Sequence, residues 1–214
     1  MTKKVFWQDP YLAEHHTRAI SVKDNEVKVE STIFYALSGG QESDHGEFNG
    51  IKVLAARHEG REIVYELPQD HSIKVGDPVI QQINWQRRYR LMRLHFAAEI
   101  ILELVYLKYP GIHKIGAHIG AEKARIDFAW AENISSSFAA LTVSAEQIIK
   151  GDEMIESAFS DEAAGRRYWK IDAFSAVPCG GTHLKRTAEV GGITLKRKNI
   201  GKGKERIEIF VDDR

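Results

Sequence analysis

The chain has 214 residues with 30 basic and 30 acidic side chains, so its formal net charge is zero. This balance argues against binding bulk nucleic acid through charge alone, although it allows a local basic face. The single cysteine excludes an internal disulfide framework and is typical of a reducing compartment. No window reaches the apolar length of a membrane helix, and no apolar core follows Lys3 and Lys4. We therefore expect no signal peptide, no membrane contact and a cytoplasmic location.

Short strands are expected over the first 85 residues, because β-rich runs separated by turn residues are typical of a small β-barrel. The predicted strands cover residues 27–30, 32–35, 51–54, 63–67 and 78–83. Between them, Gly39 and Gly40 predict a loop with unusual backbone angles. A change of composition near residue 85 predicts a boundary between two domains, 1–85 and 86–214.

A long helix is predicted over residues 87–109, because apolar residues recur there with a period near 3.6 and Pro110-Gly111 follows. A second helix is predicted over 142–158, with Ser144 as its cap. Further strands are predicted over 125–130, 168–173, 192–196 and 205–211. Helices mixed with antiparallel strands predict the α+β class.

Four side chains are spaced as two pairs of metal ligands. His95 and Glu99 lie one helical turn apart, and Cys179 and His183 are four residues apart in a Pro/Gly-rich loop. Zinc prefers thiolate and imidazole donors, and one cysteine with a carboxylate is more typical of catalytic than of structural zinc. Spacing alone leaves two interpretations open: a tetrahedral zinc site, or buried side chains that serve packing.

Five motifs lie in order within residues 34–46 (FYALSGGQ and DHG), 88–99 (RYRLMRLHFAAE), 116–128 (GAHIG and RIDF), 178–183 (PCGGTH) and 187–207 (TAEVG and KGKERI). Together they resemble the editing domain of alanyl-tRNA synthetase and the freestanding alanyl-tRNA editing (AlaX) proteins. The resemblance extends from about Val5 to Phe210. The glycine-rich motif that begins at Phe34 is similar to that of the larger AlaX forms, which carry an extra N-terminal domain.

The resemblance implies a small N-terminal β-barrel domain, followed by an α+β zinc-binding editing domain of the threonyl/alanyl-tRNA synthetase second additional domain type. It implies a zinc-dependent aminoacyl-tRNA deacylase whose partner is the acceptor end of tRNA(Ala) carrying a wrong amino acid. Ser-tRNA(Ala) is the foremost expected substrate and Gly-tRNA(Ala) the second. The implied zinc ligands are His95, Glu99, Cys179 and His183, with Glu99 and His95 as catalytic residues. The implied substrate-binding residues are Gly39, Gly40, Gln41, Arg93, Gly116 and Thr182.

The sequence departs from the family's pattern at two positions. Glu99 stands where the family has a second histidine, and Ala117 replaces a serine near the expected pocket. We prefer Glu99 as a zinc ligand; the alternatives are that it orients or deprotonates a water molecule, or that it marks a weakened site. Without a full zinc site the chain would be a non-catalytic tRNA-binding or partner-binding module. A hydrolase of another aminoacyl ester is a further alternative, and both monomer and homodimer remain open.

Two basic clusters flank the expected metal site in sequence. Four arginines (Arg87, Arg88, Arg90 and Arg93) precede His95, and eight basic residues against two acidic ones lie between Lys185 and Arg206. Such clusters predict a face that attracts tRNA phosphates. The alternative is an ordinary solvated surface.

Overall fold

The computed structural model describes residues 2–213, which divide into two compact units. The first unit comprises the chain up to Ser38 and Glu42–Tyr89, and the second comprises Gly39–Gln41 and the chain from Arg90 onward. The boundary predicted at residue 85 falls about one helical turn earlier. Within residues 2–213, no helix combines the length and apolarity needed to cross a bilayer.

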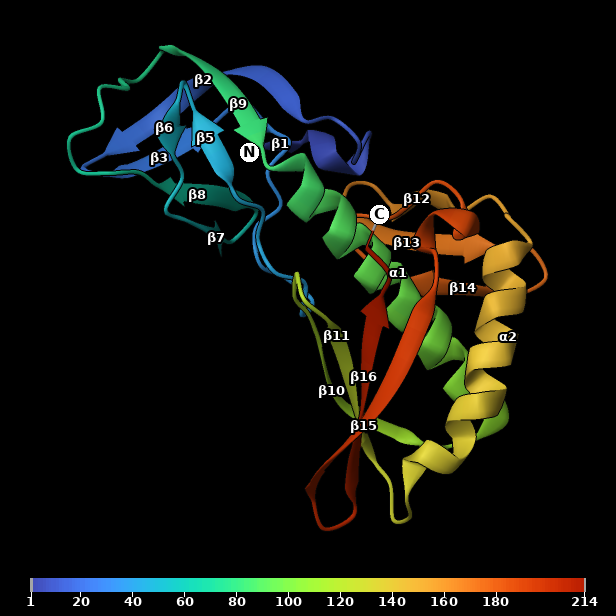
Figure 1. The fold of residues 1–214 in the computed structure, drawn as a ribbon. Helices are drawn as coiled ribbons and strands as arrows, with labels where there is room; N and C mark the ends of the chain where they lie inside the picture. Colours follow the sequence, from blue (N-terminus) through green and yellow to red (C-terminus); the bar gives the residue numbers. More distant parts are fainter. Residues whose placement is uncertain (1, 214) are drawn as a thin grey trace. The chain divides into compact units, whose positions relative to one another are not determined.

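The first unit is built on a curled antiparallel sheet with the strand order β6-β5-β9-β2-β3-β8-β7 (Figure 1). Its strands are β2 (Glu14–Lys23), β3 (Glu26–Val29), β5 (Gly46–Phe48), β6 (Ile51–Lys52), β7 (Ala55–Glu59), β8 (Glu62–Glu66) and β9 (Pro78–Ile83). A short parallel pair, β1 (Lys3–Lys4) and β4 (Ser31–Thr32), accompanies this sheet. The described strand pairings end at β6 and β7, so they do not confirm the expected closure into a barrel.

Aromatic side chains fill the core of the first unit. The rings of Phe34, Phe48 and Tyr65 are fully buried and meet edge to face at centroid distances of 4.9 to 5.8 Å. A Cβ atom on Gly46 would lie 2.6 Å from the Phe34 ring and 2.8 Å from the Cα atom of Ile83, so only glycine fits there. The strand expected over 32–35 is wrong beyond Thr32, because Phe34 and Tyr35 are buried as irregular chain.

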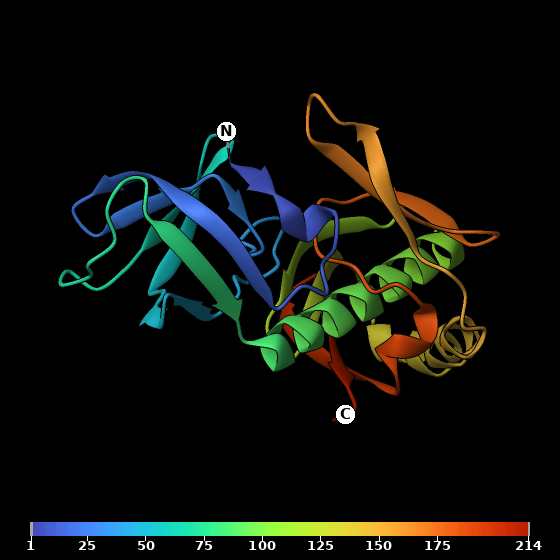
Figure 2. The same cartoon turned by 90° about the horizontal axis from the view of Figure 1, so that it is seen from above.

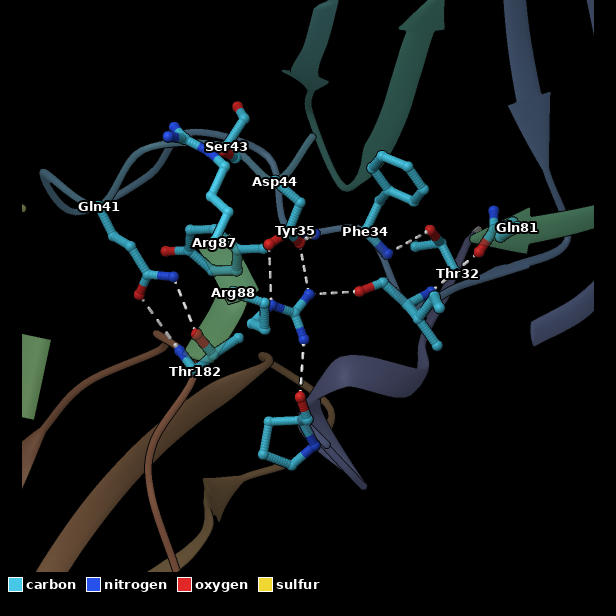
Figure 3. Close-up of polar contacts among 12 residues, drawn as sticks. Thr32, Phe34, Tyr35, Gln41, Ser43, Asp44, Gln81, Arg87, Arg88 and Thr182 are labelled. Atoms are coloured by element: carbon cyan, nitrogen blue, oxygen red, sulfur yellow. Dashed lines mark hydrogen bonds and ion pairs between the residues drawn. The ribbon is translucent and has the colours of Figure 1, made fainter. Parts of the chain in front are cut away.

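One ion pair lies wholly inside the first unit (Figure 3). The guanidinium of Arg88 donates to both carboxylate oxygens of Asp44, at 2.8 Å from Nε to Oδ1, and neither side chain is exposed. Its remaining donors reach the carbonyl oxygens of Pro10 and Ile33 at 2.8 and 2.6 Å. The amide of Tyr35 donates to Asp44 at 2.6 Å. Because this ion pair is buried and its hydrogen bonds are made within the first unit, its role is structural. The expectation that Arg88 faces RNA is therefore wrong.

The second unit combines two helices with two antiparallel sheets, as expected for the α+β class. The helices are α1 (Trp85–Lys108), whose first turn belongs to the first unit, and α2 (Phe138–Lys150). One sheet has the order β10 (His113–Ile119), β11 (Ala124–Ala129), β16 (Lys204–Val211), β15 (Ile193–Gly201); the other contains β12 (Glu156–Asp161), β13 (Arg166–Ile171) and β14 (Ser175–Pro178). In the view of Figure 2, α1 has β12 and β13 on one side and α2 on the other.

Local signals set the two ends of α1. The side chain of Asn84 accepts the amide of Arg87 at 2.9 Å, which satisfies one of the unpaired donors at the start of the helix. Pro110 follows the last turn, and Gly111 takes a positive φ of 85° that ends the helical backbone. The helix expected over 87–109 is therefore confirmed to within two residues.

The second helix differs from its expected range of 142–158. It begins at Phe138 and ends at Lys150, so Ser144 lies inside the helix and does not cap it. The chain leaves the helix because Gly151 occupies the C-terminal cap and Asp152 takes a positive φ of 49°. The acidic residues after Lys150 lie in a turn and in β12.

Replacing Asp44 with asparagine leaves the Arg88 guanidinium buried without its carboxylate. We expect the free energy of unfolding to fall by about 3–5 kcal/mol, as measured by urea denaturation followed by circular dichroism. The matched control is Glu26→Gln, which removes the exposed partner of Arg57 and leaves the urea midpoint unchanged. Equal midpoints for the two variants would contradict the structural role of this pair.

Candidate metal centre

Helix α1 and the loop after β14 bring three expected zinc ligands together. The Cys179 sulfur lies 3.5 Å from His95 Nε2 and 3.2 Å from His183 Nε2. One ligand atom from each of the three residues lies within 4.8 Å of the other two. Both imidazoles are buried, and Cys179 is half-buried. The two segments are far apart in sequence, so this cluster is a product of the fold.

These three residues fit a zinc ion in both chemistry and spacing. Zinc binds sulfur at about 2.3 Å and imidazole nitrogen at about 2.0–2.1 Å, so tetrahedral ligation separates a sulfur from a nitrogen by about 3.6 Å. The two observed sulfur–nitrogen distances, 3.5 and 3.2 Å, lie close to this value. A thiol with two imidazoles is also a donor set that favours zinc over the hard cations.

Glu99 lies beside this cluster on the same face of α1. Its Oε1 atom is 3.2 Å from His95 Nε2, and its side chain is 14 % exposed. It is not one of the three residues whose ligand atoms lie within 4.8 Å of one another. The geometry therefore places the carboxylate at the His95 side of the cluster, and its role as fourth ligand stays a prediction.

The charges of Cys179 and Glu99 favour a positive charge on His95. Burial opposes protonation of His95, but the charges and hydrogen bonds of Cys179 and Glu99 outweigh it and raise the pKa of His95 to about 10. Burial also opposes ionisation of Glu99, yet the hydrogen bond and charge of His95 lower the pKa of its carboxyl. For His183, burial and the positive charges of His95 and Arg167 lower the pKa, which keeps this imidazole neutral. A metal ion would have to displace the proton of His95, because an imidazole nitrogen binds a metal only when it is deprotonated.

The second glycine of the Cys-Gly-Gly-Thr-His run lies against the His95 ring. A Cβ atom on Gly181 would lie 2.7 Å from His95 Nδ1 and 2.9 Å from Gln41 Oε1, closer than real side chains approach. A Cβ atom on Gly180 would meet nothing within 4 Å. Within the described residues, His95 Nδ1 is buried with no hydrogen-bond partner, so this packing contact fixes the ring from that side.

The glycine-rich motif reaches the same loop through Gln41. Its side-chain amide donates to Thr182 Oγ1 at 2.9 Å and accepts the Thr182 amide at 3.3 Å (Figure 3). Gln41 forms a bridge with Ile119 of β10, and a Cβ atom on Gly40 would lie 2.9 Å from the Ala117 carbonyl oxygen. The structure thus brings Gly40, Gln41 and Thr182 together next to His183, with Gly39 directly before them.

Two other expected substrate-binding residues lie among structural contacts. Gly116 lies opposite Asp127 in the β10–β11 pairing. Arg93 is 2 % exposed and donates to the Val190 carbonyl oxygen at 2.9 and 3.0 Å and to Asp212. The described contacts give Arg93 a role in joining α1 to the segment before β15 and to the end of the chain. Substrate contact by Gly116 and Arg93 stays a prediction.

The four arginines that precede His95 all form ion pairs with carboxylates of the chain. Besides Arg88 and Arg93, Arg87 pairs with Glu42 at 2.7 Å and Arg90 pairs with Asp213 at 2.8 Å. Since Arg88 and Arg93 are buried, the expectation that this run forms an RNA-binding face is wrong for those two residues.

Two residues that sequence reasoning missed support the cluster. Ser157 in β12 bonds His183 Nδ1 at 2.9 Å, the outer-shell contact that orients a metal-binding imidazole. Arg167 in β13 is buried, and its carbonyl oxygen accepts the Cys179 amide at 2.9 Å. Neither residue belongs to a spaced motif, so the sequence does not indicate that they lie at the site. They reach it because β12, β13 and β14 pair in one sheet.

Comparison with known proteins assigns the chain to a family. Residues 166–208, which include Cys179 and His183, match the family described as the threonyl and alanyl tRNA synthetase second additional domain. The chain is 34 % identical over 224 residues to the alanyl-tRNA editing protein AlaX-M of Pyrococcus horikoshii, covering 99 % of both chains. It is also 34 % identical over 237 residues to the AlaX-M protein of Saccharolobus solfataricus, again covering 99 % of both.

A longer relative shares the same region. The alanine–tRNA ligase of Methanococcus maripaludis is 28 % identical over 229 residues, which cover 97 % of this chain and 26 % of the ligase. The matched segment shows that the protein carries the second additional domain of these synthetases. More particularly, the chain belongs to the alanyl-tRNA editing protein family of the AlaX-M type, which confirms the resemblance seen in its sequence motifs.

Replacing Gly181 with alanine forces a methyl group against the His95 ring. We expect the affinity for Zn²⁺ to fall by at least about 10-fold, the scale at which disturbed ligand orientation weakens metal sites. Competition with a chromophoric chelator measures this affinity. The matched control is Gly180→Ala, which adds the same methyl group in open space and should bind zinc as the wild type does. Equal affinities for the two variants would contradict the packing argument.

Proposed function

We propose that this protein is a zinc-dependent trans-editing hydrolase that removes a wrong amino acid from tRNA(Ala) in the cytoplasm. One observation carries the proposal: a half-buried thiol and two buried imidazoles with zinc-like spacing lie in a chain whose full length matches alanyl-tRNA editing proteins. His95, Cys179 and His183 would hold the ion. Glu99 would complete the ligand set from the same helical face as His95.

The reaction is hydrolysis of the ester between the amino acid and the terminal ribose. The water oxygen joins the acyl carbon, the acyl–oxygen bond breaks, and one proton goes to the departing ribose oxygen. When bound, zinc supplies Lewis-acid activation of this reaction. The alternative role for Glu99 is to accept the proton of the attacking water, which its lowered pKa permits because the carboxylate stays ionised near neutral pH.

We infer that Thr182 would select serine over alanine. Its hydroxyl oxygen accepts a hydrogen bond from Gln41, so its own proton is available to a serine hydroxyl on the substrate. Alanine would leave this buried donor unpaired, and sites built for a hydrogen bond reject the analogue that lacks it far more strongly than size exclusion can. We therefore rank Ser-tRNA(Ala) as the first substrate and Gly-tRNA(Ala) as the second, with Ala-tRNA(Ala) spared.

Deacylation of Ser-, Gly- and Ala-tRNA(Ala) by the purified protein tests the proposal. We expect hydrolysis of the seryl ester, loss of activity with a zinc chelator and its recovery when zinc is restored. Cys179→Ala should lower kcat/KM by at least about 100-fold, since a metal contributes several kcal/mol and each 1.4 kcal/mol is tenfold in rate.

Other outcomes of the same assay support the alternatives. Absence of hydrolysis with zinc supplied would favour a tRNA-binding or partner-binding module, for which the replacement of the family's histidine by Glu99 gives a reason. Equal turnover of a small seryl ester and of the tRNA ester would favour a hydrolase of another aminoacyl ester.

A further inference from the structure

We propose that one face of the sheet β10-β11-β16-β15 binds the RNA strand of the substrate's acceptor arm, through lysines that contact phosphates and a phenylalanine that stacks on a base. This inference rests on the proposed function, because it takes the substrate to be a tRNA. The open sheet face, as we name it, consists of Lys123, Arg125, Asp127, Lys196, Lys198, Lys204, Arg206, Glu208 and Phe210. Figure 1 shows the four strands of this sheet side by side.

Burial alternates strictly along β16 and identifies this face. Its odd-numbered residues from Glu205 to Val211 are buried, whereas its even-numbered residues from Lys204 to Phe210 are exposed or half-buried. Residues paired across strands share a face of the sheet. The register pairs Lys196 and Arg125 with Glu208, and it pairs Lys198 and Asp127 with Arg206. These side chains therefore share the face opposite the apolar core.

The open sheet face carries a strong excess of positive charge. It holds six cations and two carboxylates, which leaves four net positive charges on a chain whose formal net charge is zero. Arg125 and Arg206 share Asp127, and Lys123 bonds Glu208 at 2.7 Å. The remaining lysines (Lys196, Lys198 and Lys204) are exposed, and none forms an ion pair within residues 2–213. This charge is complementary to a phosphate backbone.

An aromatic ring lies among these lysines. Phe210 is half-buried on the open sheet face, with the Lys196 ammonium 4.9 Å and the Lys123 ammonium 5.9 Å from its ring centroid. Aromatic rings on β-sheets stack on the bases of single-stranded RNA while neighbouring cations bind its phosphates. The two ammonium groups lie over the Phe210 ring, so a base that stacks there would displace an ammonium group from the ring face that it covers. The unpaired 3′ nucleotides of an acceptor arm present such a strand.

The sheet is joined to the metal centre through its edge strand. Ile119 of β10 forms a bridge with Gln41, and the Gln41 amide bonds Thr182, the neighbour of His183. RNA held on the sheet would therefore be bound by the same unit that holds the proposed catalytic cluster. By contrast, the four arginines before His95 form ion pairs with carboxylates of the chain itself.

Binding of uncharged tRNA(Ala), followed by fluorescence anisotropy at several salt concentrations, tests the proposal without requiring catalysis. We expect the double variant Lys196→Glu/Lys198→Glu to weaken binding by at least about 10-fold and to reduce the slope of affinity against salt concentration. Phe210→Ala should weaken binding by about 5- to 150-fold, the scale of one lost base-stacking contact, with a smaller effect on the salt slope.

The matched control is Lys23→Glu/Lys74→Glu, which makes the same change of charge at two exposed lysines of the first unit and should leave binding within about twofold of the wild type. Circular dichroism and zinc content confirm that each variant is folded.

If the two double variants weaken binding equally, the open sheet face is not the RNA surface. If the wild type hydrolyses no aminoacyl ester but Lys196→Glu/Lys198→Glu weakens its binding of tRNA(Ala), this inference is supported and the proposed function is contradicted. If the wild type deacylates its substrate but the double variant binds tRNA(Ala) as tightly as the wild type does, this inference is contradicted and the proposed function is supported.

Discussion

The close approach of the loop Pro178–His183 to helix α1 is the constraint on which the proposed site depends. At Gly181 the backbone of this loop lies against the imidazole of His95, where no side chain fits. This contact sets Cys179 and His183 opposite His95 at ligand distances. The side-chain amide of Gln41 forms hydrogen bonds with the hydroxyl and the backbone amide of Thr182 in the same loop. The two glycines after Cys179 thus have different roles: Gly181 makes room for a ligand, whereas Gly180 borders open space.

Buried polar contacts explain why so many conspicuous charges of the sequence are unavailable to a substrate. Arg88 is held by Asp44 inside the first unit, and Arg93 is held by Val190 and Asp212 in the second. Exposed positive charge gathers on the open sheet face of the second unit, where Asp127 and Glu208 neutralise only part of it. A count of basic residues along the chain does not distinguish these two situations, because pairing with carboxylates distant in sequence decides the outcome.

Local sequence signals predicted the features that depend on neighbours along the chain. The period of apolar residues and the Pro-Gly pair after it located α1, and the four-residue spacings found His95, Cys179 and His183. The C-terminal end of α2 was missed because the apolar pattern continues past Gly151 and Asp152, the two residues that end the helix. Strand β2 was missed because its polar residues give little β signal, and Ser157 was missed because its contact with His183 exists only after strand pairing.

X-ray absorption spectroscopy at the zinc edge of the zinc-loaded protein tests the central claim most directly. The proposed ligands predict one sulfur scatterer at about 2.3 Å, with nitrogen or oxygen scatterers at about 2.0–2.1 Å. The sulfur should disappear in Cys179→Ala. A wild-type first shell that contains nitrogen and oxygen but no sulfur would show that Cys179 does not bind the metal, and it would contradict the account of the site.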